Sequence, residues 1–410
     1  MRDLVPPEAQ RRRALGRALA EVFASFGYAP VSTPPFELES VMARAIEASD
    51  ARELLRFVDA ESGEVVMLRP DITPQIARVV ASRLRDRPLP IRLSYEGHVV
   101  RRRRGRARTQ RQIAQAGVEC LGIAGAEADV EVVELASRAL RAVGLVEHRI
   151  ELNLPTLAGT LALALEPERR EDAERALARK DRAELSRILA GAPAALRDGL
   201  LAALDLVGGR EVIARARKIA KDGPARAGVD RLEGILRTLE GLDLGVEIQL
   251  DLGEPRGLGY YTGPSFAILA HGPGEPVASG GRYDELLARF GAPMPATGVA
   301  IDLDHVERAL GTSGPIEEPP RSALLAGEVS PALAAAIRAS GTAVATFPGA
   351  TLAEARAHAA AWGHDAVAHV RGARAVVVRN DSEARVTVDA LPSFLAASAP
   401  RSSGRARTKR

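Results

Sequence analysis

The sequence predicts an α+β protein: a mostly antiparallel sheet flanked by helices, with a helical insertion and a small C-terminal α/β domain. Three observations support this class. Strand-like runs occupy residues 64–69, 91–95, 98–101, 246–252 and 265–270. From about residue 155 to about residue 242 the composition shifts to Ala, Leu, Arg, Glu and Asp, which favours helices. After a proline-rich stretch at 315–320, strand-like and helical runs alternate, as in a compact α/β domain.

The composition is that of a globular protein with room for two or three domains. The chain has 410 residues, 46% hydrophobic and 27% charged, with a net charge of +3. No apolar stretch approaches the roughly 20 residues that span a bilayer, and the N-terminus lacks the apolar core of a secretory signal. The single Cys120 excludes internal disulfides and cysteine-based zinc sites, and the seven histidines lack ligand spacing. We therefore expect a cytoplasmic protein without a metal or other cofactor.

The first element is predicted to be a helix that starts near Pro6 and Pro7 and ends at Gly27. Its apolar side chains repeat at helical spacing along one face, namely Leu15, Leu19, Val22 and Phe23. An extended segment follows at 31–37, and its two prolines place it at the edge of a sheet.

Later elements follow from the same patterns. A helix is predicted near residues 127–143, and the region 155–242 is interpreted as a helical insertion. In that insertion, Asp181 and Glu184 have the spacing of a helix-capping pair. Beyond the 315–320 hinge, runs at 323–326, 343–347, 366–370, 375–379 and 386–388 predict the strands of a small domain over 321–395. The basic residues 396–410 are expected to be a disordered tail.

Two glycine-rich segments hold three of the five tyrosines in a chain that is only 3% aromatic. Tyr260 and Tyr261 lie in the first segment, 256–263, and Tyr283 lies in the second, 280–284. Tyrosine packs its ring while its hydroxyl forms hydrogen bonds, so these segments predict a polar pocket. The first segment does not match a dinucleotide loop, because a strand-like run rather than a helix follows it. We expect it to form a tight bend between antiparallel strands.

Two earlier groups of polar residues are predicted to face the same pocket. One is the run 68–73, which contains Asp71 and Thr73. The other comprises 95–101 and 111–119, interpreted as two antiparallel strands joined by a basic loop. Alternation along the second strand places Gln115 and Glu119 on one face of the sheet.

In this order, the four groups resemble the class II aminoacyl-tRNA synthetases, and histidyl-tRNA synthetase in particular. The segment 31–37 resembles motif 1, the dimer-forming element, and 95–119 resembles motif 2. The segments 256–261 and 280–284 resemble the two histidine-specific signatures, and 298–305 occupies the place of motif 3. The resemblance covers about residues 1–310 and implies a synthetase-like domain over 1–312.

The resemblance also implies a histidine-binding pocket. Asp71, Thr73 and Gln115 would bind the α-ammonium group of histidine. Arg101 and Arg256 would face its carboxylate, and Glu119 and Tyr261 would engage the imidazole nitrogens. The wall would be shaped by Tyr260 and Tyr283. These residue types suit a zwitterion, which needs an anion and a cation placed apart.

The half of the site that would bind ATP departs from the family pattern. His305 stands where motif 3 ends in an arginine, and Arg103 stands where motif 2 carries a glutamate. Ile113 replaces the aromatic residue that stacks on the purine, and Gly259 replaces an aspartate. A mostly neutral imidazole cannot reproduce the charge and fork of a guanidinium. We therefore interpret the ATP site as degraded and expect no catalytic residues.

A histidine pocket without adenylation machinery resembles the regulatory-subunit family of ATP phosphoribosyltransferase, a synthetase paralogue. That family implies a short-form catalytic subunit as partner, L-histidine as feedback effector, a self-dimer through 31–37, and a role in the first step of histidine biosynthesis. Two alternatives stay open: an active histidyl-tRNA synthetase with divergent ATP motifs, and an RNA-binding paralogue that uses the arginine-rich stretch 101–111 and the basic tail. We favour the regulatory subunit and expect neither a membrane nor a nucleic acid as partner.

Overall fold

The computed structural model describes residues 3–45, 54–101, 111–253, 255, 260–311, 322–379 and 382–397. The chain divides into two compact units, Met1–Ile316 and Glu317–Arg410. Each unit is described by itself below. Among the described residues, no helix combines the length and the apolar character that crossing a membrane requires.

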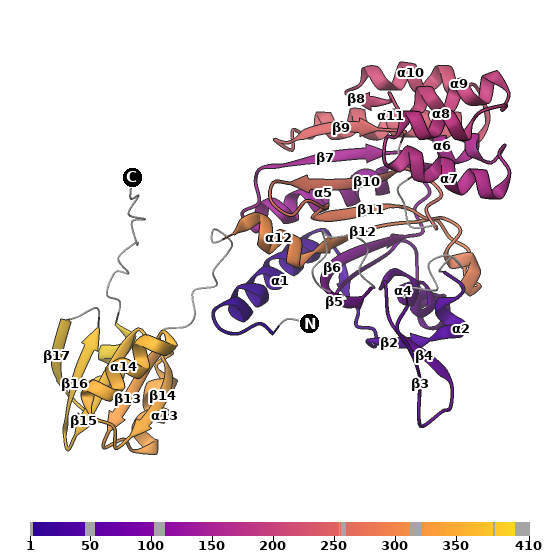
Figure 1. Cartoon of the computed structure of the whole chain (residues 1–410). Coiled ribbons are helices and arrows are strands. Elements are labelled where there is room, and N and C mark those ends of the chain that lie inside the picture. Colours follow the sequence, from indigo (N-terminus) through magenta and orange to yellow (C-terminus); the bar gives the residue numbers. More distant parts are fainter. Residues whose placement is uncertain are drawn as a thin grey trace. The chain divides into compact units, whose positions relative to one another are not determined.

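The first unit is built on a nine-stranded sheet (Figure 1). From edge to edge its strands are β1 Ala29–Pro30, β5 Ile91–Val100, β6 Gln112–Leu121, β12 Ala296–Asp302, β11 Ala278–Arg282, β10 Ser265–Ala270, β7 His148–Asn153, β9 Glu247–Asp251 and β8 Val207–Gly208. Neighbouring strands run antiparallel except at β1–β5 and β7–β9. The predicted antiparallel-rich sheet is therefore confirmed.

Helices cover the face of the sheet that forms the main core. The predicted first helix is α1 Glu8–Ser25, and Gly27 after it adopts a positive φ of 82°. The buried face of α1 packs on α5 Ala126–Ala142, and both helices share one core with apolar residues of β6, β7 and β10, among them Val118, Ile150 and Ile268. A third helix, α12 Leu303–Leu310, follows β12 directly and joins this core. Because alternate strand residues point to this core, the others are left for the opposite face.

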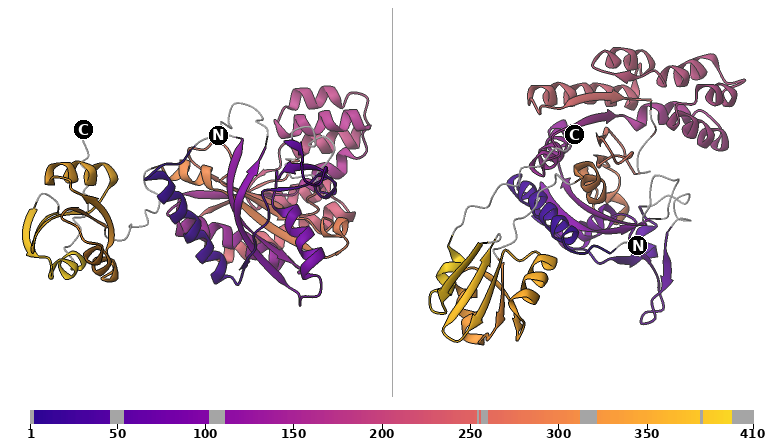
Figure 2. Two further views of the ribbon diagram at one scale, coloured as in Figure 1. Left: turned by 90° about the horizontal axis from the view of Figure 1, so that it is seen from below. Right: turned by 60° about the vertical axis from the view of Figure 1, so that its left-hand side comes forward.

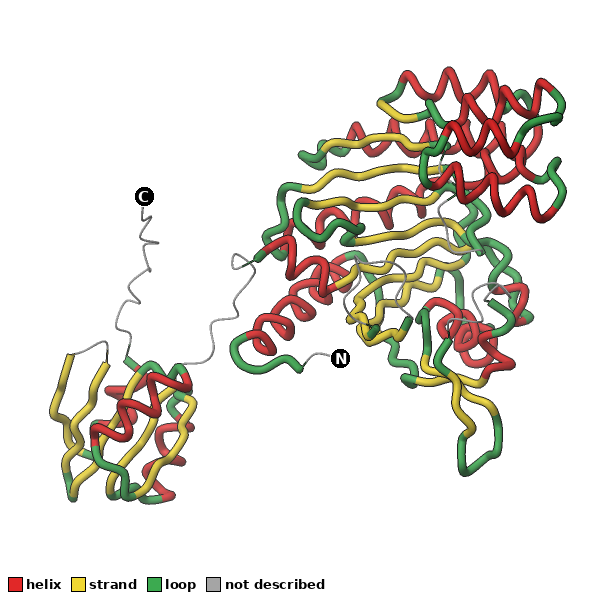
Figure 3. The backbone as a smooth tube through the Cα atoms, in the orientation of Figure 1, coloured by secondary structure: helices red, strands yellow, loops and turns green. Residues whose placement is uncertain are grey.

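The helical insertion comprises α6 Pro155–Ala162, α7 Pro167–Ala178, α8 Arg182–Ile188, α9 Ala194–Ala203, α10 Glu211–Ile219 and α11 Gly223–Gly241. These helices gather at the β7–β9 end of the sheet, as the tube drawing and two further views show (Figures 2 and 3). The helices α6 to α9 enclose a core of their own, whereas α10 and α11 contribute to the main core. Asp181 caps α8 by accepting from the Glu184 N–H at 2.9 Å, while the Glu184 carboxylate pairs with Arg187 instead of completing the box.

A small second sheet lies in the N-terminal part of the first unit. It consists of β2 Phe36–Leu38, β4 Val65–Leu68 and β3 Arg56–Val58, in that order. The short helix α2 Glu39–Met42 follows β2, and α4 Thr73–Val79 follows β4 and continues as a π-helical turn, Val80–Leu84. A 3₁₀ turn, Leu287–Phe290, lies between β11 and β12. The extended segment 31–37 leads from the edge strand β1 to the edge strand β2, as its prolines predict.

Two local predictions are wrong. The runs 91–95 and 98–101 are not separate strands, because β5 pairs with β6 continuously from Ile91 to Val100. The glycine-rich segment 256–263 is not a tight bend between paired strands, because β7 lies between β9 and β10 in the sheet. The residue pattern near the segment could not reveal this, since β7 comes from about a hundred residues earlier in the chain.

The second unit is a three-layer α/β structure. Its strands are β13 Ser322–Gly327, β14 Ala343–Pro348, β15 Ala366–Arg371, β16 Arg374–Arg379 and β17 Ser382–Thr387, in the sheet order β14-β13-β15-β16-β17. The helices α13 Pro331–Ala339 and α15 Leu391–Ala396 pack on one face, and α14 Leu352–Trp362 packs on the other. The predicted α/β character of this region is confirmed, although the last strand lies at 382–387 rather than at 386–388.

Candidate functional site

A cavity of about 280 Å³ opens on the face of the large sheet opposite to α5. Strands β6, β7, β10, β11 and β12 supply its floor, and residues beside β4 and β11 supply its walls. Eight residues that the sequence assigns to histidine binding line this one cavity: Asp71, Thr73, Arg101, Gln115, Glu119, Tyr260, Tyr261 and Tyr283. The ninth, Arg256, lies outside the described residues.

Small residues in register across the sheet keep the cavity floor open. One cross-strand row runs Asn153, Ser265, Gly281, Gly298, Glu119 from β7 to β6. In this row, Gly298 leaves room for the Glu119 carboxyl group. A Cβ at Gly298 would lie only 1.8 Å from Glu119 Oε2, so no other residue fits at this position without displacing the carboxyl.

Glu119 is the buried centre of the site, with 1% of its surface exposed. Its Oε1 accepts a 2.5 Å hydrogen bond from the Thr73 hydroxyl, and its Oε2 accepts from the Tyr283 hydroxyl. Burial raises the pKa of Glu119 to about 8, because the charged form loses its hydration. The two hydroxyl donors oppose this pKa increase, and the nearby Asp71 adds to it. The cavity therefore holds a carboxyl group whose charge changes near pH 8.

Asp71 forms the second acidic centre. Its Oδ2 accepts from the Tyr260 hydroxyl at 2.8 Å, and its Oδ1 accepts from the Thr73 N–H at 3.3 Å. The Tyr260 ring contacts Tyr261 and Tyr283 edge-to-face, with centroids 5.3 and 5.6 Å apart. Burial and the nearby Glu119 raise the pKa of all three tyrosines far above 10, and Asp71 adds to the increase for Tyr260 and Tyr261, so each phenol stays a neutral hydroxyl.

Two buried amide oxygens on the cavity lining have no hydrogen-bond partner among the described residues. They are Gln115 Oε1 and Asn153 Oδ1, and each residue is only 6% exposed. A buried acceptor without a partner is costly, so both positions favour a ligand that brings N–H or O–H donors. At the rim, Arg101 donates from Nε to the Pro70 carbonyl at 2.6 Å, which holds a cation beside these acceptors.

Of the three residues assigned to a degraded ATP site, the two that the structure describes, Ile113 and His305, lie outside the cavity lining. Ile113 packs in the apolar cluster beside Val99 and Tyr95, and Arg103 lies outside the described residues. His305, in the first turn of α12, is buried, and its Nδ1 donates to the Pro276 carbonyl at 2.9 Å. Neither Ile113 nor His305 lines the cavity, although Pro276 does.

Sequence reasoning missed the polar residues at the far end of the cavity. They are Glu151 and Asn153 of β7, Ser265 of β10, Ser279 of β11 and Asp302 of β12. The alternation in 148–153 was the available signal, since Ile150 and Leu152 face the core and leave Glu151 and Asn153 on the pocket face. Only strand pairing brings these residues opposite Glu119.

Comparison with known proteins identifies a matching family model, curated relatives and similar solved structures. The model of the histidyl-tRNA synthetase family matches residues 1–306. The chain is 44% identical to an ATP phosphoribosyltransferase regulatory subunit of Anaeromyxobacter dehalogenans (strain 2CP-1) over 314 residues, which covers 76% of this chain and 90% of that protein. It is 40% identical over 320 residues to a protein of the same name from Moorella thermoacetica, covering 76% and 81%.

Solved structures agree with these relatives. A structure from Bacillus halodurans, titled an ATP phosphoribosyltransferase regulatory subunit/histidyl-tRNA synthetase, is 28% identical with a TM-score of 0.78 and covers 91% of this chain and 97% of its own. Histidyl-tRNA synthetase from Nostoc is 20% identical with a TM-score of 0.74, covering 96% and 97%. The latter likeness shows the fold alone, and it confirms the predicted class II synthetase-like architecture.

Proposed function

The chain belongs to the family of ATP phosphoribosyltransferase regulatory subunits, and from this premise we propose that it senses free histidine in the tyrosine-lined cavity. As a regulatory subunit it works with the catalytic ATP phosphoribosyltransferase subunit in histidine biosynthesis. The observation that carries the histidine proposal is the grouping of two carboxyl groups, three neutral tyrosines and an unpaired Gln115 oxygen around one cavity. The proposed partner is a short-form catalytic chain.

The donors and acceptors of the cavity match those of histidine. The α-ammonium group would donate to Gln115 Oε1, which needs a donor, and to the Asp71 carboxylate. The Arg101 guanidinium would attract the α-carboxylate. The imidazole would lie between Glu119 and Tyr261, where one ring nitrogen donates and the other accepts. Glu119 suits this role because it is buried with both oxygens already held in place.

Feedback control would follow from closure around the bound effector. The tyrosines come from two segments: 260–263 precedes β10, and 280–284 contains the end of β11. Histidine bound between them would favour one arrangement of these segments, and the catalytic subunit would respond to that arrangement. A coupling of this kind between sites typically amounts to about 1–3 kcal/mol.

The test is histidine inhibition of the complex reconstituted with the short catalytic subunit. We expect Glu119→Gln to raise the half-inhibitory histidine concentration about tenfold or more, since a buried hydrogen bond to imidazole is lost or reversed. Glu134→Gln is the matched control, because Glu134 lies on α5 and pairs with Arg138 on the opposite side of the sheet. An unchanged inhibition constant in Glu119→Gln would refute the pocket assignment.

We further propose that the cavity does not activate histidine with ATP. Besides Glu119, the acids Asp71, Glu151 and Asp302 line it, and Arg101 is the one lysine or arginine among its described lining residues. This balance opposes a triphosphate. The family's regulatory role agrees with a non-catalytic chain. We expect no histidine-dependent ATP–pyrophosphate exchange above the background without enzyme; measurable exchange by the purified chain would contradict this.

A self-dimer through the motif 1-like segment is the remaining part of the proposal. It is supported by an apolar patch on the second sheet, where Phe36, Leu38 and Phe57 are exposed on the same face. The Phe36 and Phe57 rings contact each other edge-to-face, with centroids 6.2 Å apart. We expect light scattering to give a dimeric mass that falls to the monomer in Phe57→Glu but not in Val146→Glu, an exposed apolar residue outside this sheet.

A further inference from the structure

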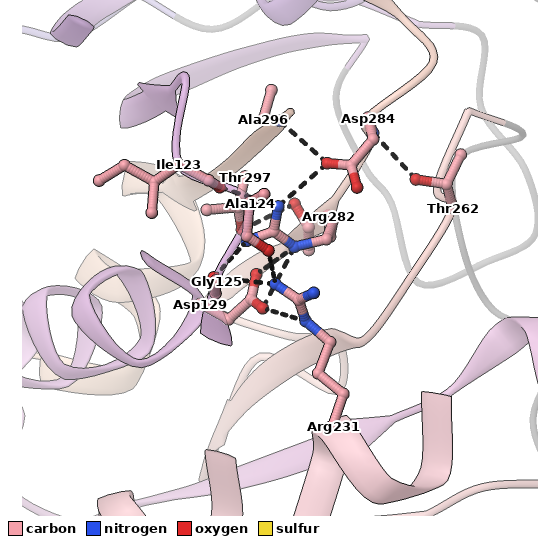
Figure 4. Close-up of polar contacts among 11 residues, drawn as sticks. Ile123, Ala124, Gly125, Asp129, Arg231, Thr262, Arg282, Asp284, Ala296 and Thr297 are labelled. Carbon is pink, nitrogen blue, oxygen red and sulfur yellow. Dashed lines mark hydrogen bonds and ion pairs between the residues drawn. The ribbon is translucent and has the colours of Figure 1, made fainter. Parts of the chain in front are cut away.

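Arg282, the last residue of β11, is a fully buried cation with 2% of its side chain exposed. Its Nε donates to both oxygens of Asp129 in α5, at 2.9 and 3.2 Å (Figure 4). One terminal nitrogen donates to Asp284 Oδ1 at 3.0 Å and to the Ile123 carbonyl at 3.1 Å, and the other donates to the Gly125 carbonyl at 3.0 Å. A guanidinium held by this many partners has one defined position.

Arg282 and its partners Asp129 and Asp284 are called the Arg282 group below. This group connects directly to the segments that carry Tyr261 and Tyr283. Asp284 follows Tyr283, and its N–H donates to the Thr262 hydroxyl at 2.9 Å. Thr262 follows Tyr261, and its N–H donates to the Arg282 carbonyl at 2.8 Å. The Asp284 carboxylate also accepts from the Ala296 N–H at 3.0 Å, which ties the segment to β12. The backbone beside Tyr261 and Tyr283 is therefore held through Arg282 and Asp284.

The same group connects to the helical insertion through Arg231 of α11. Figure 4 shows Arg231 reaching from its helix to Asp129, beside Arg282. The Arg231 Nε donates to Asp129 Oδ2 at 2.8 Å, and a terminal nitrogen donates to the Ala124 and Gly125 carbonyls at 2.8 and 2.9 Å. Asp129 and the Gly125 carbonyl are thus shared by two arginines, one from the sheet and one from the insertion.

Because Asp129 pairs with both Arg231 and Arg282, the loss of either arginine would change the charge balance of the Arg282 group. Two arginines face Asp129 and Asp284, so the group is balanced in charge. Removing Arg231 would leave Asp129 with Arg282 alone, and the shared oxygens would become free to change position. Interactions in a buried network of this kind are strongly non-additive. A displacement of α11 would therefore reach Arg282 and, through it, the segments that carry Tyr261 and Tyr283.

From this geometry we propose that Arg282 is a positioning residue for the pocket tyrosines and that Arg231 couples their position to the helical insertion. The insertion then acts as a second element that responds to the effector pocket. This proposal rests on the proposed function for the identity of the effector. The link from α11 to the tyrosine segments consists of hydrogen bonds within the chain, so it can be tested independently of the effector.

The test compares Arg231→Met with wild type by amide hydrogen exchange of the full-length, unliganded chain. We expect the amides of Thr262, Tyr283 and Asp284 to exchange at least fivefold faster in Arg231→Met, since their hydrogen bonds depend on Arg282 staying in place. Arg237→Met is the matched control, because Arg237 also lies on α11 but is 67% exposed and is no part of the Arg282 group. Arg231→Lys keeps the charge but not the fork, and its exchange rates should fall between the two.

A second measurement addresses the effector. Calorimetry should show histidine binding weakened at least fivefold in Arg231→Met and unchanged in Arg237→Met, at matched thermal stability. Unchanged exchange at Thr262, Tyr283 and Asp284 in Arg231→Met would overturn the coupling, whether or not histidine binds. A wild-type chain that fails to bind histidine would instead overturn the proposed function, and the exchange result would still decide the coupling.

Discussion

At the residue scale, Glu119 links the chemistry of the pocket to the stability of the fold. Its pKa is raised to about 8 in the folded chain, against an ordinary value near 4.5. The folded state therefore binds a proton that the unfolded state releases, throughout the pH range between these values. Stability contributed by the protonated form is lost as the pH rises through this range, by on the order of a few kcal/mol.

We accordingly predict that Glu119→Gln is more stable than wild type at pH 8.5 and that this advantage shrinks at pH 5.5. The amide keeps the shape of the carboxyl but cannot ionise in the buried site. Thermal unfolding midpoints of both chains at the two pH values check this. A stability difference that does not depend on pH would show that Glu119 ionises freely in the folded chain.

Glu131 provides a control, because its pKa is shifted in the direction opposite to that of Glu119. Burial raises the pKa of Glu131, but hydrogen bonds from Arg92 and Tyr28 outweigh this effect and lower it. Its contribution to stability is present above the ordinary glutamate pKa and is lost as the pH falls through the lowered value. Glu131→Gln should therefore be less stable than wild type at pH 7, with a gap that narrows in acid.

A second residue-scale prediction concerns Gly298. In Gly298→Ala the new methyl group would meet Glu119 Oε2 at 1.8 Å and the Val118 carbonyl at 2.6 Å, so the carboxyl must move. We expect histidine affinity to fall about tenfold or more and stability to fall by about 1–3 kcal/mol. Calorimetry and chemical unfolding measure the two effects.

Gly159→Ala is the matched glycine control. Gly159 lies inside α6, and nothing approaches the position that its Cβ would take. Alanine there should stabilise the chain by about 0.5–1 kcal/mol and leave histidine affinity unchanged. If both alanine variants behaved alike, the crowding at Gly298 would be unimportant to the pocket.

At the element scale, one arginine connects the first helix to the helix that follows β12. Arg12 of α1 donates to Asp304 at 2.6 Å and to both oxygens of Glu307 at 2.8 and 2.6 Å in α12. The Arg12 side chain is 12% exposed, and the Asp304 and Glu307 side chains are 23% and 25% exposed, so the three groups are partly buried. Asp304 also accepts from the Ala114 N–H of β6, which draws the helix pair onto the sheet.

We predict that Arg12→Met lowers the free energy of unfolding by about 1–3 kcal/mol, because two partly buried carboxylates lose their cation. The neighbouring Arg13 is exposed, and Arg13→Met should change the free energy of unfolding by less than about 0.5 kcal/mol. Urea unfolding of both variants checks the difference. Equal values would mean that the helix pair is held by apolar packing alone.

The elements themselves were largely predictable because helix and strand periodicity is local. The first helix, the strand 265–270 and the helix at 126–142 lie within a residue or two of their predicted positions. The pairing around the glycine-rich segment was not predictable in the same way. Its flanking strands β9 and β10 are separated by β7, and the choice of neighbour depends on contacts between distant parts of the chain.

At the scale of the whole molecule, the cavity belongs entirely to the first unit. All described lining residues lie between Asp71 and Asp302, and the second unit has two core clusters of its own. A unit with its own core can fold independently. We therefore predict that the chain ending at residue 316 binds histidine within about twofold of the full-length affinity.

Calorimetry on the truncated and full-length chains measures this. Loss of binding in a truncated chain that still unfolds cooperatively would show that the second unit contributes to the pocket. Equal affinities would leave the second unit free for another role in the complex with the catalytic subunit.

The residue pattern alone was enough to predict the fold class and the family, and it placed eight of the cavity-lining residues in one pocket. Asp71, Gln115, Glu119 and the three tyrosines could be assigned because their types and order carry the resemblance, and alternation fixes the face on which each strand residue lies.

Which polar groups lie opposite one another became apparent from the folded arrangement of the strands and helices. This arrangement set Asn153 in one row with Glu119, placed β7 beside β10, and joined Arg282 to Arg231 through Asp129. The physical reason is that sheet register and buried ion pairs depend on segments a hundred or more residues apart, and local periodicity carries no information about that pairing.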